Sequence, residues 1–338
     1  MRSRNPRLMI PALFFLAPFA ARGVEPAPAA VVARQTIAAL LKIPVADPDV
    51  SVTVRGVKEE DGLIIEDIFW ESLDNERPIA YVIRPAKPAA QRLPAIIYLH
   101  GSSGSRDSES TKTFAVGQWT NANGKTGTGL RGSARELARR GYLTLALTQR
   151  GLDARGPSTE DQTKDMLIRG RVLMGAIVYE IRQAVTYLAR RQDVDPQKIG
   201  MSGLSFGGIT TFYTWLVDFR IAAAAPICGG VGSLDVLARR GSRAYHGIYW
   251  WIPNMLTKGD QGDFAAAMAP RPLMLWGPTE DIGMPKEGVD RFVAAVRPAY
   301  EKMGAGGSFA AYQRPGVHEL STEAFELMVK FFDAWLRK

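Results

Sequence analysis

Three polar residues in the second half of the chain could together carry out nucleophilic acyl transfer, and Ser205 is the first of them. It lies in GLSFG, residues 203–207, which fits the pattern G-x-S-x-G. In this pattern a strand turns sharply into a helix and presents the serine at the tip. Glycines beside the serine tolerate the backbone angles of such a bend and let strand and helix approach closely. The alternative is a short glycine-rich connection without chemistry. The choice between the two depends on whether the chain also supplies a base and an acid.

A catalytic serine needs a base to take its proton and a third group to orient that base. The chain has three histidines, and serine, acid and histidine follow in this order in hydrolases with such a turn. Only His318, in RPGVHELS, lies beyond a loop that could supply the acid. We interpret His318 as the base; a structural histidine without chemistry is the alternative. The acid is expected in GPTEDIGMP, where Glu280 and Asp281 stand side by side.

Acyl transfer also requires hydrogen-bond donors for the negative oxygen that develops on the attacked carbonyl. The backbone N–H of Phe206, the residue after the serine, is one expected donor. The loop HGSSG supplies the other, for which we choose the N–H of Ser102. His100, at the start of this loop, is expected to shape it by bonding the backbone.

An aromatic segment, residues 241–263, precedes the acid and could form a small cap-like insertion around residues 231–262. Its aromatic side chains could line an acyl or sugar pocket, or they could form the insertion's own small core. These side chains are Tyr245, Tyr249, Trp250 and Trp251. His246 is expected to be structural, and Arg150 and Asp153 are expected to take part in a loop ion pair.

No stretch has the spacing of a metal site, and no G-x-G-x-x-G follows the first strand, so we expect neither a metal nor another cofactor. The first 23 residues combine Arg2, Arg4 and Arg7 with an apolar run and small residues, which is the pattern of a secretory signal peptide. The run is too short for a spanning helix, which needs about 20 residues, so we expect no stable membrane anchor after cleavage.

Cleavage is expected after Gly23 or, as a second choice, after Ala29. The leader holds four arginines and no acid, so the formal charge falls from +8 to +4. A basic stripe for nucleic acid is therefore not expected. Cys228 is the only cysteine and lies in an apolar stretch that predicts a buried strand. Export without an internal disulfide favours a bacterial periplasm or the extracellular space. The oligomeric state is left open.

The elements needed to position these residues follow from the apolar pattern. A leading group of strands is predicted to be antiparallel, at residues 51–57, 63–72 and 79–86. Short apolar runs then predict buried parallel strands at residues 93–100, 142–148, 199–203, 222–228, 271–277 and 309–315. Helical segments alternate with them, which predicts an α/β fold.

That fold is a mostly parallel twisted sheet with helices on both faces, formed by a single domain of residues 24–338. Ser133 and Glu136 suggest a capping box before one helix, and Ser321 or Thr322 should cap the last. Polar residues 101–129 are expected to run over the surface.

The ordered set YLHGSSG, QDVDPQKIGMSGLSFGG, MAPRPLMLWGPTED and RPGVHE resembles the α/β-hydrolase superfamily. Within it, the chain is similar to dienelactone hydrolase-like and acetyl xylan esterase-like serine hydrolases, which are related to the catalytic domain of prolyl oligopeptidases. In these relatives the acid stands four residues before a proline. Asp281 keeps that distance to Pro285, whereas Glu280 keeps the spacing from Gly277, so Asp281 is preferred and Glu280 is the alternative.

The resemblance implies a Ser-His-Asp hydrolase that acts on a small-molecule or carbohydrate ester with a short acyl group. A serine in place of the cysteine of dienelactone hydrolases favours ordinary esters. A peptidase like the prolyl oligopeptidases is one alternative, although the chain lacks their N-terminal propeller. A noncatalytic binding module on the same fold is another.

Overall fold

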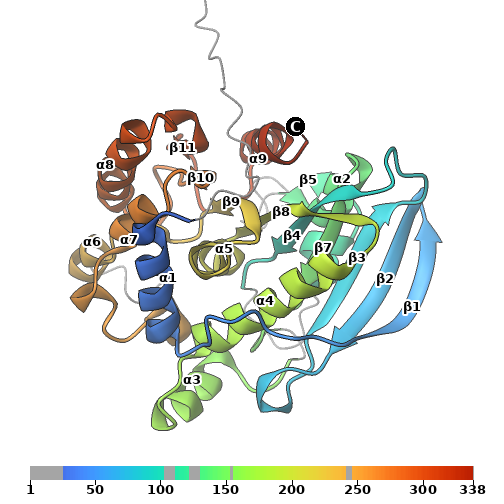
Figure 1. Cartoon of the computed structure of the whole chain (residues 1–338), viewed down its shortest axis with the longest axis horizontal. Coiled ribbons are helices and arrows are strands. Elements are labelled where there is room, and N and C mark those ends of the chain that lie inside the picture. The colour runs from blue at the N-terminus through green and yellow to red at the C-terminus, as the bar shows by residue number, and fades with distance from the viewer. Residues whose placement is uncertain (1–25, 103–110, 122–129, 153–154, 241–245, 338) are drawn as a thin grey trace, which may run out of the picture.

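The computed structural model describes residues 26–102, 111–121, 130–152, 155–240 and 246–337. Within these residues one sheet has nine strands in the order β1-β2-β3-β7-β4-β8-β9-β10-β11 (Figure 1). The strands of the sheet are β1 (Val52–Glu60), β2 (Leu63–Trp70), β3 (Ile79–Pro85), β4 (Leu93–Leu99), β7 (Leu143–Leu147), β8 (Val194–Leu204), β9 (Ile221–Ile227), β10 (Leu273–Trp276) and β11 (Phe309–Tyr312). A separate small ribbon pairs β5 (Thr120–Asn121) with β6 (Leu130–Arg131).

The six strands β7, β4, β8, β9, β10 and β11 run parallel to one another. β1, β2 and β3 form the antiparallel edge that the sequence predicts, and β3 is also antiparallel to β7. Their register aligns the carboxyl ends. Leu99 of β4 lies opposite Gly203 of β8, and Ile227 of β9 lies opposite both Leu204 of β8 and Trp276 of β10. Loops that follow these strands therefore emerge along one edge of the sheet.

Alternate residues of each central strand enter two separate apolar cores, one on each face of the sheet. Ile97 and Leu99 of β4 pack in one core, and Ile96 and Tyr98 pack in the other. Such burial on both faces explains the nearly continuous apolar runs. The α/β fold class expected from the sequence is thus confirmed.

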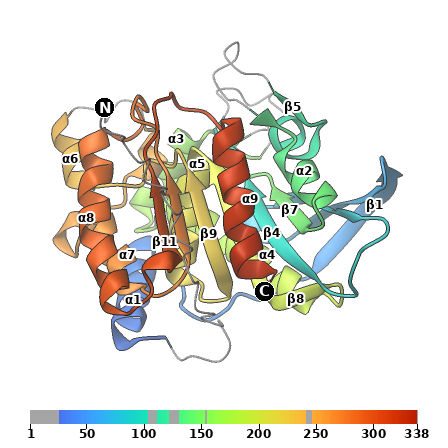
Figure 2. The ribbon, with the colours of Figure 1, turned by 90° about the horizontal axis from the view of Figure 1, so that it is seen from above.

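Helices cover both cores. The first core is covered by α1 (Pro28–Leu41), α4 (Leu173–Arg190), α5 (Phe206–Val217), α7 (Gln261–Ala267) and α8 (Lys286–Lys302). The second lies under α2 (Ser133–Arg139) and α9 (Thr322–Leu336), the latter seen across the sheet in Figure 2. Two further helices are α3 (Thr159–Ile168) and α6 (Leu234–Arg240). Ser321 caps α9 as expected, because its side chain accepts from the N–H of Ala324.

Two local expectations are wrong. Ser133 is the first residue of α2 and is fully buried, while Gly132, with φ 73°, occupies the capping position and no side chain caps the helix. The expected capping box with Glu136 is therefore absent. The polar stretch 101–129 also does not lie wholly on the surface. Residues 111–116 form a short π-helix (η2) in which Thr111, Ala115 and Val116 are buried.

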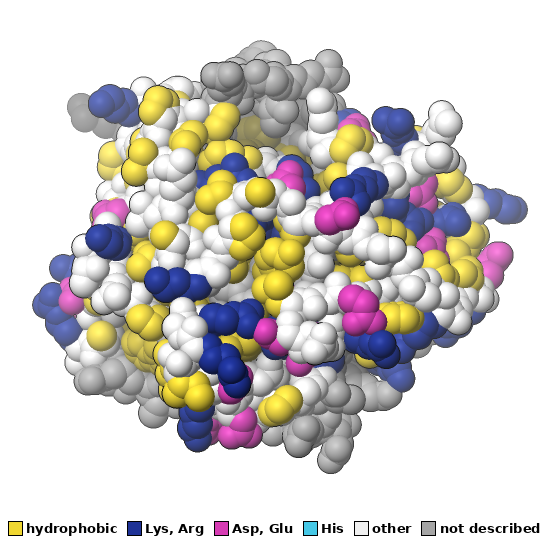
Figure 3. All heavy atoms as spheres, turned by 60° about the horizontal axis from the view of Figure 1, so that its bottom comes forward, with side chains coloured by type: hydrophobic (Ala, Val, Ile, Leu, Met, Phe, Trp, Pro, Cys, Tyr) yellow, Lys and Arg dark blue, Asp and Glu magenta, His cyan; other side chains and the backbone are white. Residues whose placement is uncertain are grey.

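The predicted leader, residues 1–23, and its first cleavage site at Gly23 lie outside the described residues. Ala29, the second site, lies in the first turn of α1. Among the helices that the structure describes, none combines the length and the hydropathy needed to cross a membrane. On the face shown in Figure 3, lysine and arginine side chains alternate with acidic and apolar ones instead of gathering in one stripe.

Candidate active site

Ser205 occupies a sharp turn between β8 and α5. Its backbone lies at φ 57° and ψ −114°, a conformation that non-glycine residues rarely adopt. A Cβ on Gly207 would lie 2.1 Å from the carbonyl oxygen of Leu99, and one on Gly203 would lie 2.6 Å from Gly207. Glycine at both positions lets α5 start directly against the end of β4. The serine side chain is thereby presented at the carboxyl edge of the sheet.

Asp281 and His318 are brought together by the loops that follow β10 and β11. The Nδ1 of His318 lies 2.8 Å from Oδ1 of Asp281, and the N–H of Gly283 donates to the same oxygen at 2.7 Å. Asp281 is 6% exposed, whereas Glu280 is exposed. Of the two adjacent carboxylates, Asp281 is the one that meets the histidine.

Backbone hydrogen bonds fasten the two loops to each other. The N–H of Thr279 donates to the carbonyl of Arg314 at 2.8 Å, and the N–H of Glu280 donates to that of Gly316 at 3.0 Å. The backbone that carries Asp281 is thus tied to the backbone that leads to His318. This ladder fixes the separation of the two side chains without help from either of them.

The two expected oxyanion donors, Phe206 and Ser102, both belong to segments next to the serine. Phe206 opens α5, so its N–H belongs to the first turn, where helical N–H groups have no partner within the helix. Ser102 follows β4, and a Cβ built on its neighbour Gly101 would lie 3.3 Å from Cβ of Ser205. The loop after β4 therefore runs beside the serine.

Tyr249 contacts both of these residues. Its ring packs edge-on against Phe206 with centroids 4.4 Å apart, and burial raises the pKa of its hydroxyl although a hydrogen bond with the Ser102 side chain lowers it. The insertion thus reaches the turn that holds Ser205, a contact that residue spacing could not indicate.

The surroundings of Trp250 and Trp251 differ from those of Tyr249. Trp250 is 2% exposed and stacks on His246 with centroids 4.3 Å apart. Both tryptophans border a cavity of about 320 Å³ whose lining does not include Ser205, Asp281 or His318. Trp250 fits the interpretation as part of the insertion's own core. Tyr245 lies outside the described residues.

His246 and His100 both bond the backbone. His246 Nε2 meets the carbonyl of Gly283 at 2.5 Å, which connects the insertion to the loop of Asp281. His100 is 1% exposed, and its Nδ1 lies 2.7 Å from the carbonyl of Gly101.

Arg150 is also structural. It is buried and pairs with Asp74 at 2.8 Å, while its expected partner Asp153 lies outside the described residues.

Cys228, placed in a buried strand by the sequence, in fact follows the end of β9 and belongs to the site. Its Sγ, a carboxylate oxygen of Asp281 and a ring nitrogen of His318 all lie within 4.8 Å of one another. Sequence reasoning missed this cluster. The sequence did offer a signal for it, since Cys228 directly follows the strand that lies between those of the serine and the acid.

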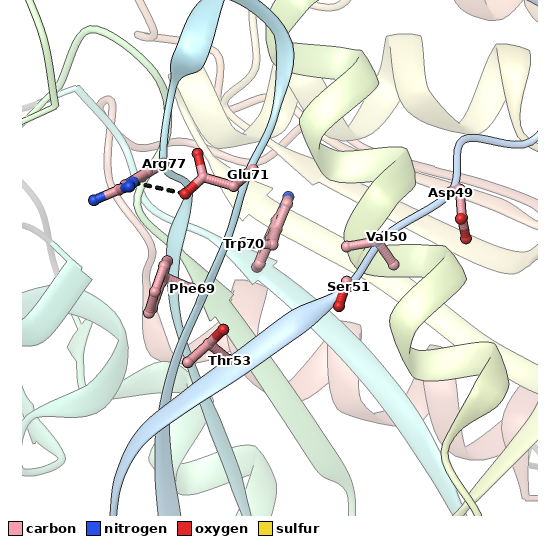
Figure 4. Close-up of a pocket in the computed structure, with 8 residues that line it drawn as sticks. All are labelled: Asp49, Val50, Ser51, Thr53, Phe69, Trp70, Glu71 and Arg77. Carbon is pink, nitrogen blue, oxygen red and sulfur yellow. Dashed lines mark hydrogen bonds and ion pairs between the residues drawn. The ribbon is translucent and has the colours of Figure 1, made fainter.

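A second cavity, of about 400 Å³, lies at the antiparallel edge between the start of β1 and the end of β2 (Figure 4). Phe69, Trp70 and the paired Glu71 and Arg77 line it. It shares no residue with the cluster around Ser205.

A serine on a strained strand-to-helix turn, with an acid and a histidine following two later strands of a parallel sheet, defines the α/β-hydrolase fold. The chain is 26% identical over 288 residues to “Putative hydrolase YtaP” of Bacillus subtilis (strain 168), covering 85% of this chain and 93% of that protein. No family model matches the sequence.

Solved esterase structures share the fold. A glucuronoyl esterase from Solibacter usitatus superposes with a TM-score of 0.65 at 19% identity, over 89% of this chain and 91% of the other. An acetyl xylan esterase from Paenibacillus sp. R4 gives 0.60 at 16% identity, over 93% and 96%. The resemblance to acetyl xylan esterase-like hydrolases is confirmed at the level of the fold.

Proposed function

We propose that this protein is an exported serine hydrolase that cleaves short-chain carboxylic esters, with esters of carbohydrates as the natural class. The observation that carries the proposal is the hydrogen bond between Asp281 and His318 at the sheet edge where the strained turn presents Ser205. A carboxylate that bonds Nδ1 leaves Nε2 of the same ring to act as a base. The names of the similar structures, acetyl xylan esterase and glucuronoyl esterase, support the substrate class.

In this mechanism Ser205 Oγ attacks the ester carbonyl as His318 takes its proton. The N–H groups of Phe206 and Ser102 stabilise the negative oxygen of the tetrahedral intermediate. His318 then gives the proton to the leaving alcohol, and an acyl-enzyme on Ser205 results. Water, deprotonated by the same histidine, releases the acid. Asp281 holds the imidazole in the required tautomer and stabilises the imidazolium.

We expect the space for the acyl group of the substrate to be short. Tyr249 packs against Phe206 and bonds Ser102, so an aromatic side chain stands beside both proposed oxyanion donors. This placement supports acetate to butyrate as the preferred acyl groups. Trp251, which is partly exposed, is the better candidate of the two tryptophans for contact with a sugar, because aromatic faces offer apolar area with polar edges.

Labelling with a fluorophosphonate tests the nucleophile directly. Wild-type protein and Ser51→Ala, a change at an exposed serine of the sheet edge, should label, and Ser205→Ala should not. Folded wild-type protein that fails to label would favour a noncatalytic binding module.

A series of p-nitrophenyl esters tests the acyl group. The ratio kcat/KM should be highest for acetate to butyrate and should fall for octanoate and palmitate. Acetylated xylo-oligosaccharides and methyl glucuronate esters, run in parallel, separate the two carbohydrate chemistries. Highest activity on long chains, or activation at an oil–water interface, would contradict the short-acyl proposal, and cleavage of peptides alone would favour a peptidase.

A further inference from the structure

Cys228 lies between the two loops that supply the acid and the histidine. The residue is 2% exposed, and its backbone N–H donates to the carbonyl of Trp276, at the end of β10, at 2.9 Å. Its Sγ lies 3.5 Å from the carbonyl of Glu319, the residue after His318. The side chain thus reaches the histidine loop while its backbone holds the strand that leads to Asp281.

The backbone conformation of Cys228 is one that residues with a side chain rarely adopt. At φ 48° the residue occupies the left-handed region, which is uncommon for side chains other than those of asparagine and aspartate. A residue held in such a region costs on the order of 1 to 3 kcal/mol and persists where its surroundings determine it. Glycine would adopt this conformation without strain. The chain carries a Cβ and a thiol here instead.

The thiol faces one charged acceptor and one neutral acceptor. Its hydrogen is donated to Glu319 O at 3.5 Å, and the Asp281 carboxylate, which lies within 4.8 Å of Sγ, also interacts with the thiol. Burial and the negative charge of Asp281 raise the pKa of the thiol, so it stays neutral and keeps its hydrogen at the pH at which a histidine base works. A neutral S–H beside the carboxylate can disperse part of its charge without adding a second charge to the site.

We propose that Cys228 is a positioning residue for Asp281. Its thiol fills the space between the acid loop and the histidine loop and provides a weak donor next to the carboxylate, so that Asp281 keeps the orientation in which it bonds His318. Cys228 acts through Asp281 and does not touch the substrate. This inference rests on the proposed serine hydrolase function.

Three substitutions at this position separate the roles of volume, donor and backbone. Cys228→Ala removes the thiol, Cys228→Ser keeps a donor, and Cys228→Gly removes the thiol together with the backbone strain. Ser202→Ala is a matched control. Ser202 is also buried, on the neighbouring strand β8, and its hydroxyl donates to Ala225 O at 2.6 Å.

The measurement is kcat/KM for p-nitrophenyl acetate as a function of pH, with thermal unfolding of each variant. We expect Cys228→Ala and Cys228→Gly to lower kcat by about five-fold with little change in KM, the scale of one weak hydrogen bond. The apparent pKa of the acid limb should move upward, since a carboxylate that has lost a donor attracts the imidazolium more strongly. Cys228→Ser should restore both quantities toward wild type, and Ser202→Ala should leave the pH profile unchanged.

The inference is overturned if folded Cys228→Ala and Cys228→Gly keep the wild-type kcat and acid limb. It is also overturned if Ser202→Ala or Cys228→Ser shifts the pH profile as far as Cys228→Ala does, because the effect would then follow from packing alone. If Cys228→Ala does not fold, Cys228→Gly carries the test, since it fits the backbone. Wild-type protein that neither labels with fluorophosphonate nor hydrolyses esters would instead reject the proposed function itself.

Discussion

Asp281 and Glu280 are adjacent carboxylates whose surroundings give them different chemistry. Asp281 is 6% exposed and accepts from the N–H of Gly283 as well as meeting His318. Glu280 is exposed, and its backbone N–H, not its carboxylate, takes part in the ladder between the two loops. A carboxylate in water interacts weakly with its neighbours. Substitutions of the two carboxylates can therefore be compared directly, because the residues are adjacent in the same loop.

Asp281→Asn should lower kcat by about 10⁴, the loss seen when the triad aspartate of a serine protease becomes asparagine. Glu280→Gln should change kcat by less than about three-fold, because a solvated carboxylate contributes little. Steady-state kinetics on p-nitrophenyl acetate measure both. The opposite result, an inactive Glu280→Gln and an active Asp281→Asn, would make Glu280 the acid.

The sequence could predict the residues of the proposed site but not every contact around them. Ser205 and His318 follow from a local pattern and from chain order, and Asp281 follows from its distance to Pro285. Contacts of Cys228 with Asp281 and of Tyr249 with Ser102 join positions that are far apart in the chain. Such contacts depend on strand order and loop path, which spacing along the chain does not contain.

At the scale of elements, the approach of α5 to β4 determines the shape of the turn at Ser205. Gly207→Ala would place a methyl group 2.1 Å from Leu99 O, a backbone atom of a central strand that cannot move aside cheaply. We expect a loss of about 3 kcal/mol in the free energy of unfolding, the upper range for overpacking. Gly56→Ala is the control, because its Cβ would have no neighbour within 4 Å. Denaturant unfolding of both variants measures the difference, and equal stabilities would contradict the close packing of the turn.

The insertion is connected to the acid loop by His246, whose pKa is lowered, mainly by burial. The hydrogen bond to Gly283 O and the charge of Asp281 oppose this shift, while His318 adds to it. A histidine with a lowered pKa binds fewer protons in the folded state than in the unfolded state. Its contribution to stability is therefore fully present above its unfolded pKa, about 6.5, and decreases as the pH falls below that value.

The free energy of unfolding should accordingly fall when the pH is lowered from about 7.5 to about 5.5. His246→Gln should be less stable at the higher pH, because it loses the stacking on Trp250, but it should show a shallower decline. Urea titrations at several pH values give both slopes. A variant with a slope as steep as that of wild type would assign the pH dependence to other groups.

Periodicity and apolar runs predict the regular elements well, since the central strands are buried on both faces. Two elements did not follow from local pattern. Serine often caps helices, yet Ser133 is buried by tertiary packing as the first residue of α2. Gly132 occupies the capping position instead. Residues 111–116 lie within a stretch that is polar overall, but Ala115 and Val116 pack beneath α2 in the second core.

At the scale of the whole molecule, the described chain begins with a helix that belongs to the main core. Ile37, Ala38 and Leu41 of α1 are buried there, and the carbonyl of Ala27 accepts from the N–H groups of Ala30 and Val31. Pro28 at the start of the helix suits a position where no N–H is required. A leader removed after Gly23 would leave this helix whole, and removal after Ala29 would delete its first two residues and the preceding Ala27.

We expect the intact mass of exported protein to correspond to residues 24–338. A chain of residues 30–338 should be less stable to unfolding by about 1 kcal/mol, the scale of a lost helix start. Mass spectrometry and denaturant unfolding check the two statements. An exported chain beginning at residue 30 with undiminished stability would favour the second cleavage site.

The position of α1 also has a consequence for the order in which the chain can fold. The guanidinium of Arg34, in α1, donates to the carbonyl of Val217 at 2.8 Å, and the two residues are 183 positions apart in the chain. The apolar face of α1 packs in the core that α5 and α7 also share. During vectorial synthesis α5 and α7 emerge long after α1, and long-range contacts form only after the entropy of a large loop has been overcome. If the predicted leader directs export, the segment next to it should therefore stay unfolded and open to the export machinery until α5 and α7 have been synthesised. Pulsed hydrogen exchange during refolding should find the amides of α1 among the last to gain protection.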